Sequence, residues 1–324
     1  MANEFKWAFI GAGTLGAKVA KEITASKRHR IVSVYVRNKE KRAAFAKTHG
    51  ALAAETAEQA ILAEGVDGVY IVTPHTSHYE YAKLALELGK PVLCEKPVST
   101  DAQKVRELVE LSREKGLYFT EAMWTWFSPV ANKVKEWFDA GEYGELQQFS
   151  MTYHMKSINY APRVSDPRLA GGALLDVGIY PITYACRLLG KPERVTCRGT
   201  LRGGIDVGEE ITLAFPGGER CSISTSILDF KGLERMKLIG SKARTDLRFY
   251  HSIDRVKLRR KHGRNESFRG KGGMLNEFDL VAGEIREGLT ESRFVPHAAT
   301  LDVMEVMDEC RRQMGLVYPF EEEG

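Results

Sequence analysis

Short runs of apolar residues alternate with helical stretches over roughly the first 120 residues of the chain. The apolar runs predict strands over residues 7–10, 31–36, 68–72, 91–94 and 118–120. Between them, apolar positions at helical spacing predict helices over residues 15–24, 40–48, 56–64, 78–88 and 101–115. Strands that alternate with crossover helices are typical of a parallel sheet covered on both faces. We therefore expect a doubly wound α/β domain at the N-terminus.

The pattern changes after residue 124. A helix over 129–140, a strand over 146–154 and a helix over 173–189 come first, followed by strands over 196–201, 209–215, 221–227, 235–239, 245–250 and 255–258. Two helices, 275–287 and 297–314, close the chain. A run of consecutive strands favours a mainly antiparallel sheet. Because 324 residues exceed what one core usually supports, we expect two domains, 1–121 and 122–324.

Composition excludes several classes of protein. The fractions of hydrophobic residues, 43%, and charged residues, 28%, are typical of a globular chain. No basic leader and no long uncharged apolar window is present, so we expect a cytoplasmic protein without a membrane span. The odd number of cysteines, without close spacing, indicates neither a disulfide framework nor a zinc site; they are Cys94, Cys186, Cys197, Cys221 and Cys310.

The formal net charge of +4 includes one basic cluster, RVKLRRKHGR, at residues 255–264. Basic clusters can contact an anion or a nucleic acid. This one alternates in character and lacks interleaved aromatic residues, so we expect a solvated hairpin and no nucleic-acid partner.

A glycine-rich motif directly follows the first strand and opens the first helix: Gly11, Ala12, Gly13, Thr14, Leu15 and Gly16. Glycines at these positions allow a tight turn and a close approach of the backbone to a pyrophosphate. The charge of the pyrophosphate then meets the N–H groups at the helix N-terminus. The strand, motif and helix together predict a Rossmann domain that binds a dinucleotide.

The end of the second strand predicts which dinucleotide binds. NAD-specific sites usually place Asp or Glu here, about 20 residues after the glycines, to bind the ribose 2′-hydroxyl. This chain has Arg37 and Asn38, with Lys41 and Arg42 one turn into the next helix. A guanidinium suits a 2′-phosphate, which favours NADP. The alternative is that these are ordinary surface bases, with NAD also accepted.

Two more motifs end predicted strands, at the edge of a parallel sheet where ligands bind. Thr73, Pro74 and His75 follow the third long strand, and His78 opens the next helix. Each histidine either contacts the cofactor or is structural. Glu95 and Lys96, followed by Pro97, terminate another apolar strand. A lysine fixed in such a turn is a candidate catalytic residue, and the alternative is a solvated charge.

The segment GGALLDVGIYP places Asp176 and Tyr180 four residues apart, on one helical face. Within a helix, Gly178 costs about 1 kcal/mol relative to Ala, and Pro181 about 3 kcal/mol. Because Gly178 and Pro181 are unfavourable in a helix yet lie beside an acid and a phenol, they indicate that the backbone approaches a ligand closely here. The alternative is a kinked core helix.

Taken together, GAGTLG, TPHTSH, CEKP and GGALLDVGIYP resemble the glucose-fructose oxidoreductase, inositol dehydrogenase and rhizopine-catabolism (Gfo/Idh/MocA) oxidoreductases. Tyr180 and the segment EAMWT resemble the dimeric dihydrodiol dehydrogenase and NADP-dependent D-xylose dehydrogenase branch. The resemblance covers essentially the whole chain. It implies a Rossmann domain followed by an open-faced, mainly antiparallel sheet domain, with both contributing to the active site.

The resemblance also implies roles. Lys96 is expected beside the nicotinamide, bound to the reacting oxygen, while Tyr180 exchanges the proton and Asp176 orients the substrate. A tyrosine with a pKa near 10 is a poor base at neutral pH, and a nearby ammonium lowers that pKa, so the lysine and tyrosine form a coherent pair. No metal is required.

The expected function is therefore an NADP-dependent dehydrogenase or reductase of a sugar, polyol or diol. Alternatives are a nucleotide-sugar ketoreductase, with Arg163, Arg168 and Lys156 supplying a basic groove, and a non-catalytic cofactor-sensing regulator. The related branch commonly has Arg where this chain has Trp126, which leaves the particular substrate open. An exposed sheet face favours a homodimer, and a tetramer is the alternative. Candidates for the substrate wall are Trp124, Trp126, Phe127, Tyr153, His154 and Arg168.

Overall fold

The computed structural model describes residues 4–159 and 162–322. The chain forms two compact units. Unit 1 comprises Met1–Ser99, Gln103–Trp124 and Gly273–His297, and unit 2 comprises Thr100–Ala102, Thr125–Gly272 and Ala298–Gly324. The domain boundary expected after residue 121 stays a prediction. In the structure, residues 273–297 pack with the N-terminal segment.

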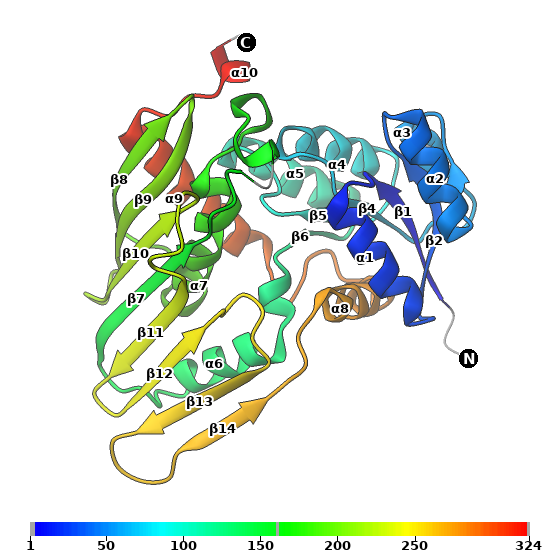
Figure 1. Cartoon of the computed structure of the whole chain (residues 1–324). Helices are drawn as coiled ribbons and strands as arrows, with labels where there is room; N and C mark the ends of the chain where they lie inside the picture. The colour runs from blue at the N-terminus through cyan, green and yellow to red at the C-terminus, as the bar shows by residue number, and fades with distance from the viewer. Residues whose placement is uncertain (1–3, 160–161, 323–324) are drawn as a thin grey trace. The chain divides into compact units, whose positions relative to one another are not determined.

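Unit 1 contains a six-stranded parallel sheet in the order β3-β2-β1-β4-β5-β6 (Figure 1). Its strands are β1 (Phe5–Ile10), β2 (His29–Tyr35), β3 (Leu52–Ala53), β4 (Gly68–Ile71), β5 (Val92–Glu95) and β6 (Phe119–Ala122). The order reverses between β1 and β4, which creates the crevice where such sheets bind ligands. The doubly wound parallel sheet is confirmed; β3, with two residues, was too short to be predicted.

The helices of this sheet are α1 (Thr14–Ala25), α2 (Lys39–His49), α3 (Ala57–Ile61), α4 (His78–Glu87) and α5 (Ala102–Lys115). The helix expected over 56–64 is shorter than predicted. Every position of β4, β5 and β6 is buried, as expected for strands covered on both faces.

Helix α8 (Met274–Arg286) lies beside α1 although it comes from the end of the chain (Figure 1). The Phe278 ring packs edge-on against Trp7 and Tyr70, with centroid distances of 5.0 and 4.9 Å. This aromatic contact explains why α8 belongs to unit 1.

Unit 2 contains an eight-stranded sheet in the order β14-β13-β12-β11-β7-β10-β9-β8. Its strands are β7 (Leu146–His154), β8 (Arg194–Arg202), β9 (Ile205–Ala214), β10 (Arg220–Ser226), β11 (Glu234–Gly240), β12 (Ala243–Arg248), β13 (Arg255–Arg260) and β14 (Glu266–Arg269). All neighbouring pairs are antiparallel except β7 and β10, which confirms the mainly antiparallel sheet. The sequence did not predict β14.

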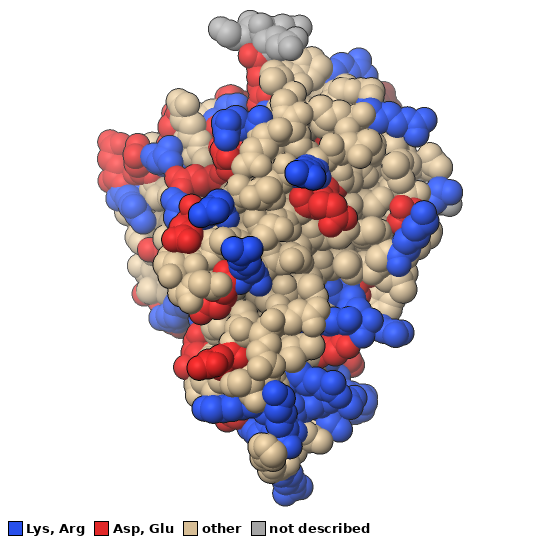
Figure 2. Space-filling model, turned by 90° about the vertical axis from the view of Figure 1, so that its left-hand side faces the viewer, with Lys and Arg blue, Asp and Glu red and all other residues tan. Residues whose placement is uncertain are grey.

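Helices cover one face of this sheet. They are α6 (Pro129–Asp139), α7 (Ile179–Leu189) and α9 (His297–Met314), with the short α10 (Pro319–Glu322) at the end. Helix α7 contacts β7 and β10, and α6 contacts β13 and β14. Figure 2 shows the side of the molecule with the outer face of β7–β10, where uncharged side chains dominate the centre and basic ones gather at the lower end.

The segment Pro167–Leu189 is long and apolar enough to cross a membrane by composition alone. In the structure 94% of its most apolar window is buried inside the protein. These side chains therefore pack the core of unit 2.

Candidate cofactor and substrate sites

The glycine-rich turn lies between β1 and α1, as predicted, and two of its glycines are required by packing. Gly11 has φ +110°, and an added Cβ would lie 2.5 Å from the Val72 carbonyl oxygen. At Gly16 a Cβ would lie 3.1 Å from the Val72 side chain. Gly13 is different, because a Cβ there would meet no protein atom within 4 Å.

Gly13 is also the N-cap of α1, and no side chain caps the helix. The first N–H groups of a helix lack internal partners and attract anions. An exposed backbone at Gly13, which protein packing leaves open, fits the pyrophosphate of a dinucleotide.

The polar residues after β2 divide into two groups. Arg42 is buried, and its guanidinium donates to the Val36 carbonyl at 3.2 Å and to Glu55 Oε2 at 2.8 Å. Asn38 caps α2 by accepting from the Lys41 N–H at 2.8 Å. Arg37 is exposed. Of the basic residues predicted here, Arg42 thus holds the end of the strand, while Arg37 is accessible to a ligand.

The two motifs that follow β4 and β5 are joined by His78, which is 1% exposed. Its Nδ1 lies 2.7 Å from the Pro97 carbonyl oxygen and its Nε2 lies 2.8 Å from the Thr73 carbonyl oxygen. A carbonyl oxygen only accepts hydrogen bonds, so both contacts are satisfied when both ring nitrogens carry protons. The structure therefore gives His78 a bracing role, while His75 lies beside it, 7% exposed.

Lys96 follows β5 in a turn built on buried carboxyl groups. Glu95 accepts from the Tyr70 hydroxyl at 2.6 Å and from the Lys96 N–H at 3.3 Å. Glu121 accepts from the Val98 N–H at 3.1 Å. Burial raises the pKa of Tyr70 well above its usual value, and the Glu95 charge adds to this effect. These bonds hold the backbone of the turn that carries Lys96.

Asp176 and Tyr180 lie in unit 2, in a helical segment that begins as a π-helix (Leu174–Gly178) and continues as α7. The helix predicted over 173–189 is therefore present with a wider first turn. Asp176, 6% exposed, accepts from Arg163 Nη2 at 2.8 Å. π-Helical turns occur frequently at functional sites.

Tyr180 lies in an aromatic group with Tyr153 of β7 and His251. Ring centroids are 5.6 Å apart for Tyr180 and Tyr153, and 5.9 Å for Tyr180 and His251. His251 and Tyr153 stack at 5.5 Å. Burial raises the pKa of Tyr153 well above its usual value, and Tyr180, Glu234 and Asp176 contribute to the shift. Asp176, Tyr180 and Tyr153, all named from the sequence, thus share one site.

Sequence reasoning missed His251 and its partner Glu234. The His251 N–H donates to Glu234 Oε1 at 2.5 Å, and the imidazole Nδ1 contacts the other carboxylate oxygen. His251 follows a strand in a loop, with no motif around it, and only the fold places it beside Tyr180. Arg163 was named only for a diphosphate groove, whereas the structure pairs it with Asp176.

Three of the other predicted substrate residues are aromatic and differ in burial. Trp126 is fully buried, with its ring 4.9 Å from Tyr184 and 4.8 Å from the Arg187 guanidinium carbon. Its neighbour Phe127 is 1% exposed, and the adjacent Trp124 is partly buried. We do not carry Trp126 and Phe127 into the proposed site, because neither ring reaches the surface.

Arg168 forms a double hydrogen bond with Asp166, and 79% of its side chain is exposed. His154 contacts Asp229 and Ser224 at 3.2 and 3.0 Å, and its neighbour Tyr153 points to the opposite face of β7. Within the described residues, the side-chain hydrogen bonds of Arg168 and His154 do not involve Tyr180, Tyr153 or His251.

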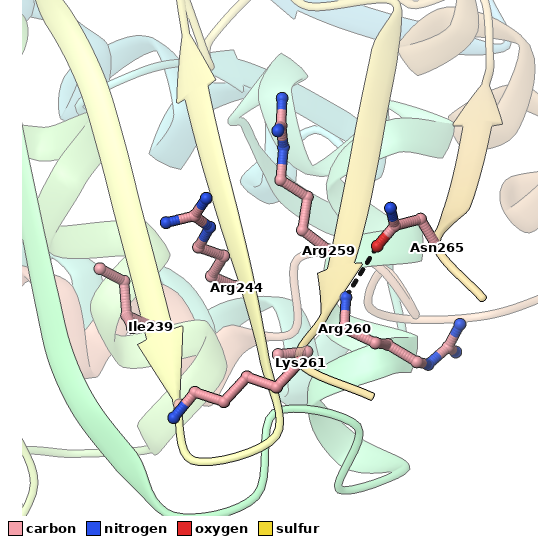
Figure 3. Close-up of a pocket in the computed structure, with 8 residues that line it drawn as sticks. Ile239, Arg244, Arg259, Arg260, Lys261 and Asn265 are labelled. Atoms are coloured by element: carbon pink, nitrogen blue, oxygen red, sulfur yellow. Dashed lines mark hydrogen bonds between the residues drawn. The ribbon is translucent and has the colours of Figure 1, made fainter. Parts of the chain in front are cut away.

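The basic cluster forms the β13–β14 hairpin, which confirms the predicted hairpin. Figure 3 shows residues that line a hollow beside it, among them Arg244, Arg259 and Lys261. The Arg260 N–H donates to Asn265 Oδ1 at 3.0 Å, and the Arg260 guanidinium binds Glu142 and Glu266. Among the described residues, no Asp, Glu, His or Tyr lines this hollow. Within the described residues, no group of three metal-ligand side chains occurs.

The chain combines a Rossmann unit, with an open glycine turn and a lysine at a strand end, and a sheet unit with a buried acid and tyrosine. This combination defines a class of dinucleotide-dependent oxidoreductases. Residues 5–123 match a family described as oxidoreductases with an NAD-binding Rossmann fold, and residues 131–246 match the Gfo/Idh/MocA C-terminal domain. The chain belongs to the Gfo/Idh/MocA family of oxidoreductases.

Named relatives align along almost the whole chain. A trans-1,2-dihydrobenzene-1,2-diol dehydrogenase of Oryctolagus cuniculus is 30% identical, over 96% of this chain and 98% of its own. An NADP⁺-dependent D-xylose 1-dehydrogenase of Hypocrea jecorina is 29% identical, over 97% of this chain and 93% of its own. Among solved structures, a 3-ketoreductase from Actinomadura kijaniata, with NADP and TDP-benzene, superposes with a TM-score of 0.85. It is 22% identical, covers 96% of this chain and 98% of its own, and confirms the fold.

Proposed function

We propose that this enzyme is an NADP-dependent dehydrogenase or reductase that acts on a hydroxyl or carbonyl group of a sugar, polyol or diol. The observation that carries the proposal is the group around Tyr180, where a phenol and a buried, arginine-paired carboxylate share one side of unit 2. Relatives that act on D-xylose and on a dihydrodiol support the substrate class.

The residues of unit 1 fit NADP. Gly11–Gly16 are assigned to the pyrophosphate and Arg37 to the 2′-phosphate. The residues assigned to the nicotinamide side are Thr73, Pro74, His75 and Glu95. When bound, the nicotinamide exchanges a hydride with the carbinol carbon of the substrate. An exposed arginine where NAD-specific sites carry an acid supports NADP.

The side chains of the protein move the proton. We assign Tyr180 to take the hydroxyl proton in the oxidative direction and to return it in the reductive direction. Lys96 is assigned to bind the reacting oxygen, and its ammonium favours the phenolate form of the tyrosine. Asp176, oriented by Arg163 at 2.8 Å, is assigned to a substrate hydroxyl.

A nucleotide-sugar ketoreductase is the second candidate. Lys156 and Arg202 line an open polar hollow in unit 2, which supplies positive charge for a diphosphate. Against this, Arg163 and Arg168 are already paired with Asp176 and Asp166. A cofactor-sensing regulator is disfavoured because a sensor requires no acid–base tyrosine.

We also propose a homodimer that uses the outer face of the unit 2 sheet. Ser150, Ser222 and Thr212 form one row across β7, β10 and β9, and they alternate with the buried positions of these strands. Light scattering of the purified protein tests this. A monomeric wild type contradicts the proposal, and Ser222→Arg is expected to convert a dimer to a monomer.

We place the enzyme in the cytoplasm. All five cysteines are free and buried, as expected for a protein of a reducing compartment. Fractionation of cells with a marker enzyme of the cytosol tests this placement.

Turnover assays test the proposed chemistry. Absorbance of the reduced cofactor is followed while aldoses, polyols, diols and a TDP-sugar are offered with NADP or NAD. Lys96→Ala and Tyr180→Phe are expected to lower kcat by about 10² or more, the usual contribution of general acid–base catalysis. Tyr184→Phe is the matched control, since it makes the same change one turn along α7, where the hydroxyl donates to the Tyr250 carbonyl.

Turnover of the TDP-sugar alone favours the ketoreductase. Cofactor binding without turnover of any compound favours the regulator. If Tyr180→Phe and Tyr184→Phe behave alike, Tyr180 does not exchange the proton.

A further inference from the structure

Two carboxyl groups that the proposed reaction does not use lie on the inner face of β9. The pairing between β8 and β9 skips Val207, which is an extra residue in β9. Such a bulge shifts the alternation of side chains by one position. Asp206 and Glu209, three residues apart, therefore both point inward and are 0% and 2% exposed.

Asp206 holds the start of the π-helix that carries Asp176. Its Oδ2 accepts from the N–H of Leu174, the first residue of that helix, at 2.6 Å. Gly172, with φ +128°, lies so close that an added Cβ would be 2.1 Å from Asp206 Oδ1. The carboxylate therefore caps the helix from a neighbouring strand, against a backbone that only glycine permits.

Glu209 is bound on its other side by Thr225 of β10. The Thr225 hydroxyl accepts from the Glu209 N–H at 3.3 Å and donates to Glu209 Oε2. The Asp206 and Glu209 carboxyl groups both face inward from the same stretch of β9. In the described chain, no donor reaches Asp206 Oδ1 or Glu209 Oε1. One proton between these two oxygens satisfies both.

The surroundings place this proton on Glu209. Burial raises the pKa of Glu209 well above its usual value, and the charge of Asp206 adds to the shift. Asp206 faces a helix N-terminus, where a negative charge is favourable. The pair also faces Cys197 of β8, Cys310 of α9 and Tyr318 before α10, and the Arg311 guanidinium carbon lies over the Tyr318 ring, 4.7 Å from its centroid.

We propose that Asp206 and Glu209 share one proton, carried by Glu209, and that this pair positions the π-helical turn Leu174–Gly178 so that it presents Asp176 and Tyr180. Both are positioning residues. The link to catalysis rests on the proposed function, which makes Asp176 and Tyr180 part of the active site. The shared proton itself does not depend on the proposed function.

Infrared spectroscopy tests the proton directly. The difference spectrum between the wild type and Glu209→Gln at neutral pH is expected to show the C=O band of a protonated carboxylic acid, and Glu210→Gln, on the exposed face of β9, is expected to show none. If the difference spectrum lacks that band, or shows only the loss of carboxylate bands, the proposal of a shared proton is wrong. The readout needs no turnover, so it stands or falls separately from the proposed function.

Stability gives a second readout. The unfolded chain releases the Glu209 proton above about pH 4.3, whereas the folded chain keeps it to a higher pH. The midpoint of thermal unfolding of the wild type should therefore fall relative to Glu209→Gln between about pH 5 and pH 8. Parallel curves contradict the proposal.

Kinetics test the positioning role. The side chain introduced by Glu209→Gln reproduces the protonated form, because its amide N–H can donate to Asp206 and its oxygen can accept from Thr225. Glu209→Gln should thus keep kcat within about twofold of the wild type. In Asp206→Asn with Glu209→Gln, two amide NH₂ groups face one another, and kcat is expected to fall roughly tenfold or more with KM little changed. Equal kcat in Glu209→Gln and in the double variant overturns the positioning role. If the double variant does not fold, the test is the single variant Glu209→Gln, and a kcat below that of the wild type then overturns the positioning role.

Discussion

Replacement of Arg37 by Ala tests how the enzyme distinguishes its cofactors. Arg37 is exposed at the end of β2, where a 2′-phosphate is expected, whereas Arg42 is held by Glu55 and by the Val36 carbonyl. NAD lacks the 2′-phosphate. Loss of the guanidinium should therefore weaken the use of NADP and leave the use of NAD unchanged.

The size of the effect follows from the exposure of Arg37. An exposed ion pair alone contributes about 1 kcal/mol or less, because water and salt screen it. A guanidinium that donates two hydrogen bonds to a phosphate contributes more, about 1.5–3 kcal/mol. With about 2 kcal/mol, kcat/KM for NADP should fall about 30-fold in Arg37→Ala, and kcat/KM for NAD should stay within about twofold.

The assay measures kcat/KM for both cofactors with one saturating substrate. Lys47→Ala serves as control, since it removes an equal charge from the far end of α2. The control should leave the ratio of the two cofactors unchanged. If Arg37→Ala lowers kcat/KM for NADP and NAD by the same factor, or changes neither, Arg37 does not recognise the 2′-phosphate.

Three further predictions concern stability, cofactor affinity and catalysis. Gly11→Ala should destabilise the protein by about 1–3 kcal/mol in denaturant unfolding, because Gly11 has a positive φ and an added Cβ clashes with a carbonyl. Gly13→Ala should unfold like the wild type and bind NADP more weakly in fluorescence titration. Equal unfolding of the two variants contradicts this prediction. Arg163→Ala leaves the buried carboxylate of Asp176 without its arginine partner, so kcat/KM should fall about 10-fold or more. Arg163→Lys should recover part of the loss. An unchanged kcat/KM in Arg163→Ala shows that the pair has no catalytic role. Burial lowers the pKa of His29, so the unfolded chain binds the proton more readily than the folded chain. Stability should therefore fall as the pH drops below about 6.5. The midpoint of thermal unfolding should depend less on pH in His29→Gln, and an equal dependence in the wild type and the variant refutes the assignment.

The elements of unit 1 could be predicted because the signals are local. An apolar run, three glycines and an Ala-rich helix lie within about 20 residues, and the structure places the turn where the motif requires it. The ends of β1, β2, β4 and β5, where the predicted motifs lie, are also at one sheet edge, since parallel strands share their direction.

Other features had no local signal. β14 is short and polar, and it forms through pairing with β13. His251 joins Tyr180 only because β12 ends near β7 in the folded sheet, and α8 returns to unit 1 through contacts of Phe278 with Trp7 and Tyr70. Each depends on residues far apart in the sequence.

The sequence by itself determined the class of fold and the dinucleotide turn, because both depend on local pattern and short spacing. It also named Lys96, Asp176 and Tyr180 as candidate catalytic residues, through the motifs that carry the family resemblance. Tertiary structure decided which arginine is accessible after β2, since Glu55 engages Arg42 and leaves Arg37 exposed. It also decided that Asp206 and Glu209 both face inward, because a single bulge reverses the alternation that the sequence alone would predict. Burial and hydrogen-bond partners belong to the folded chain, and they determine which of several similar side chains can act.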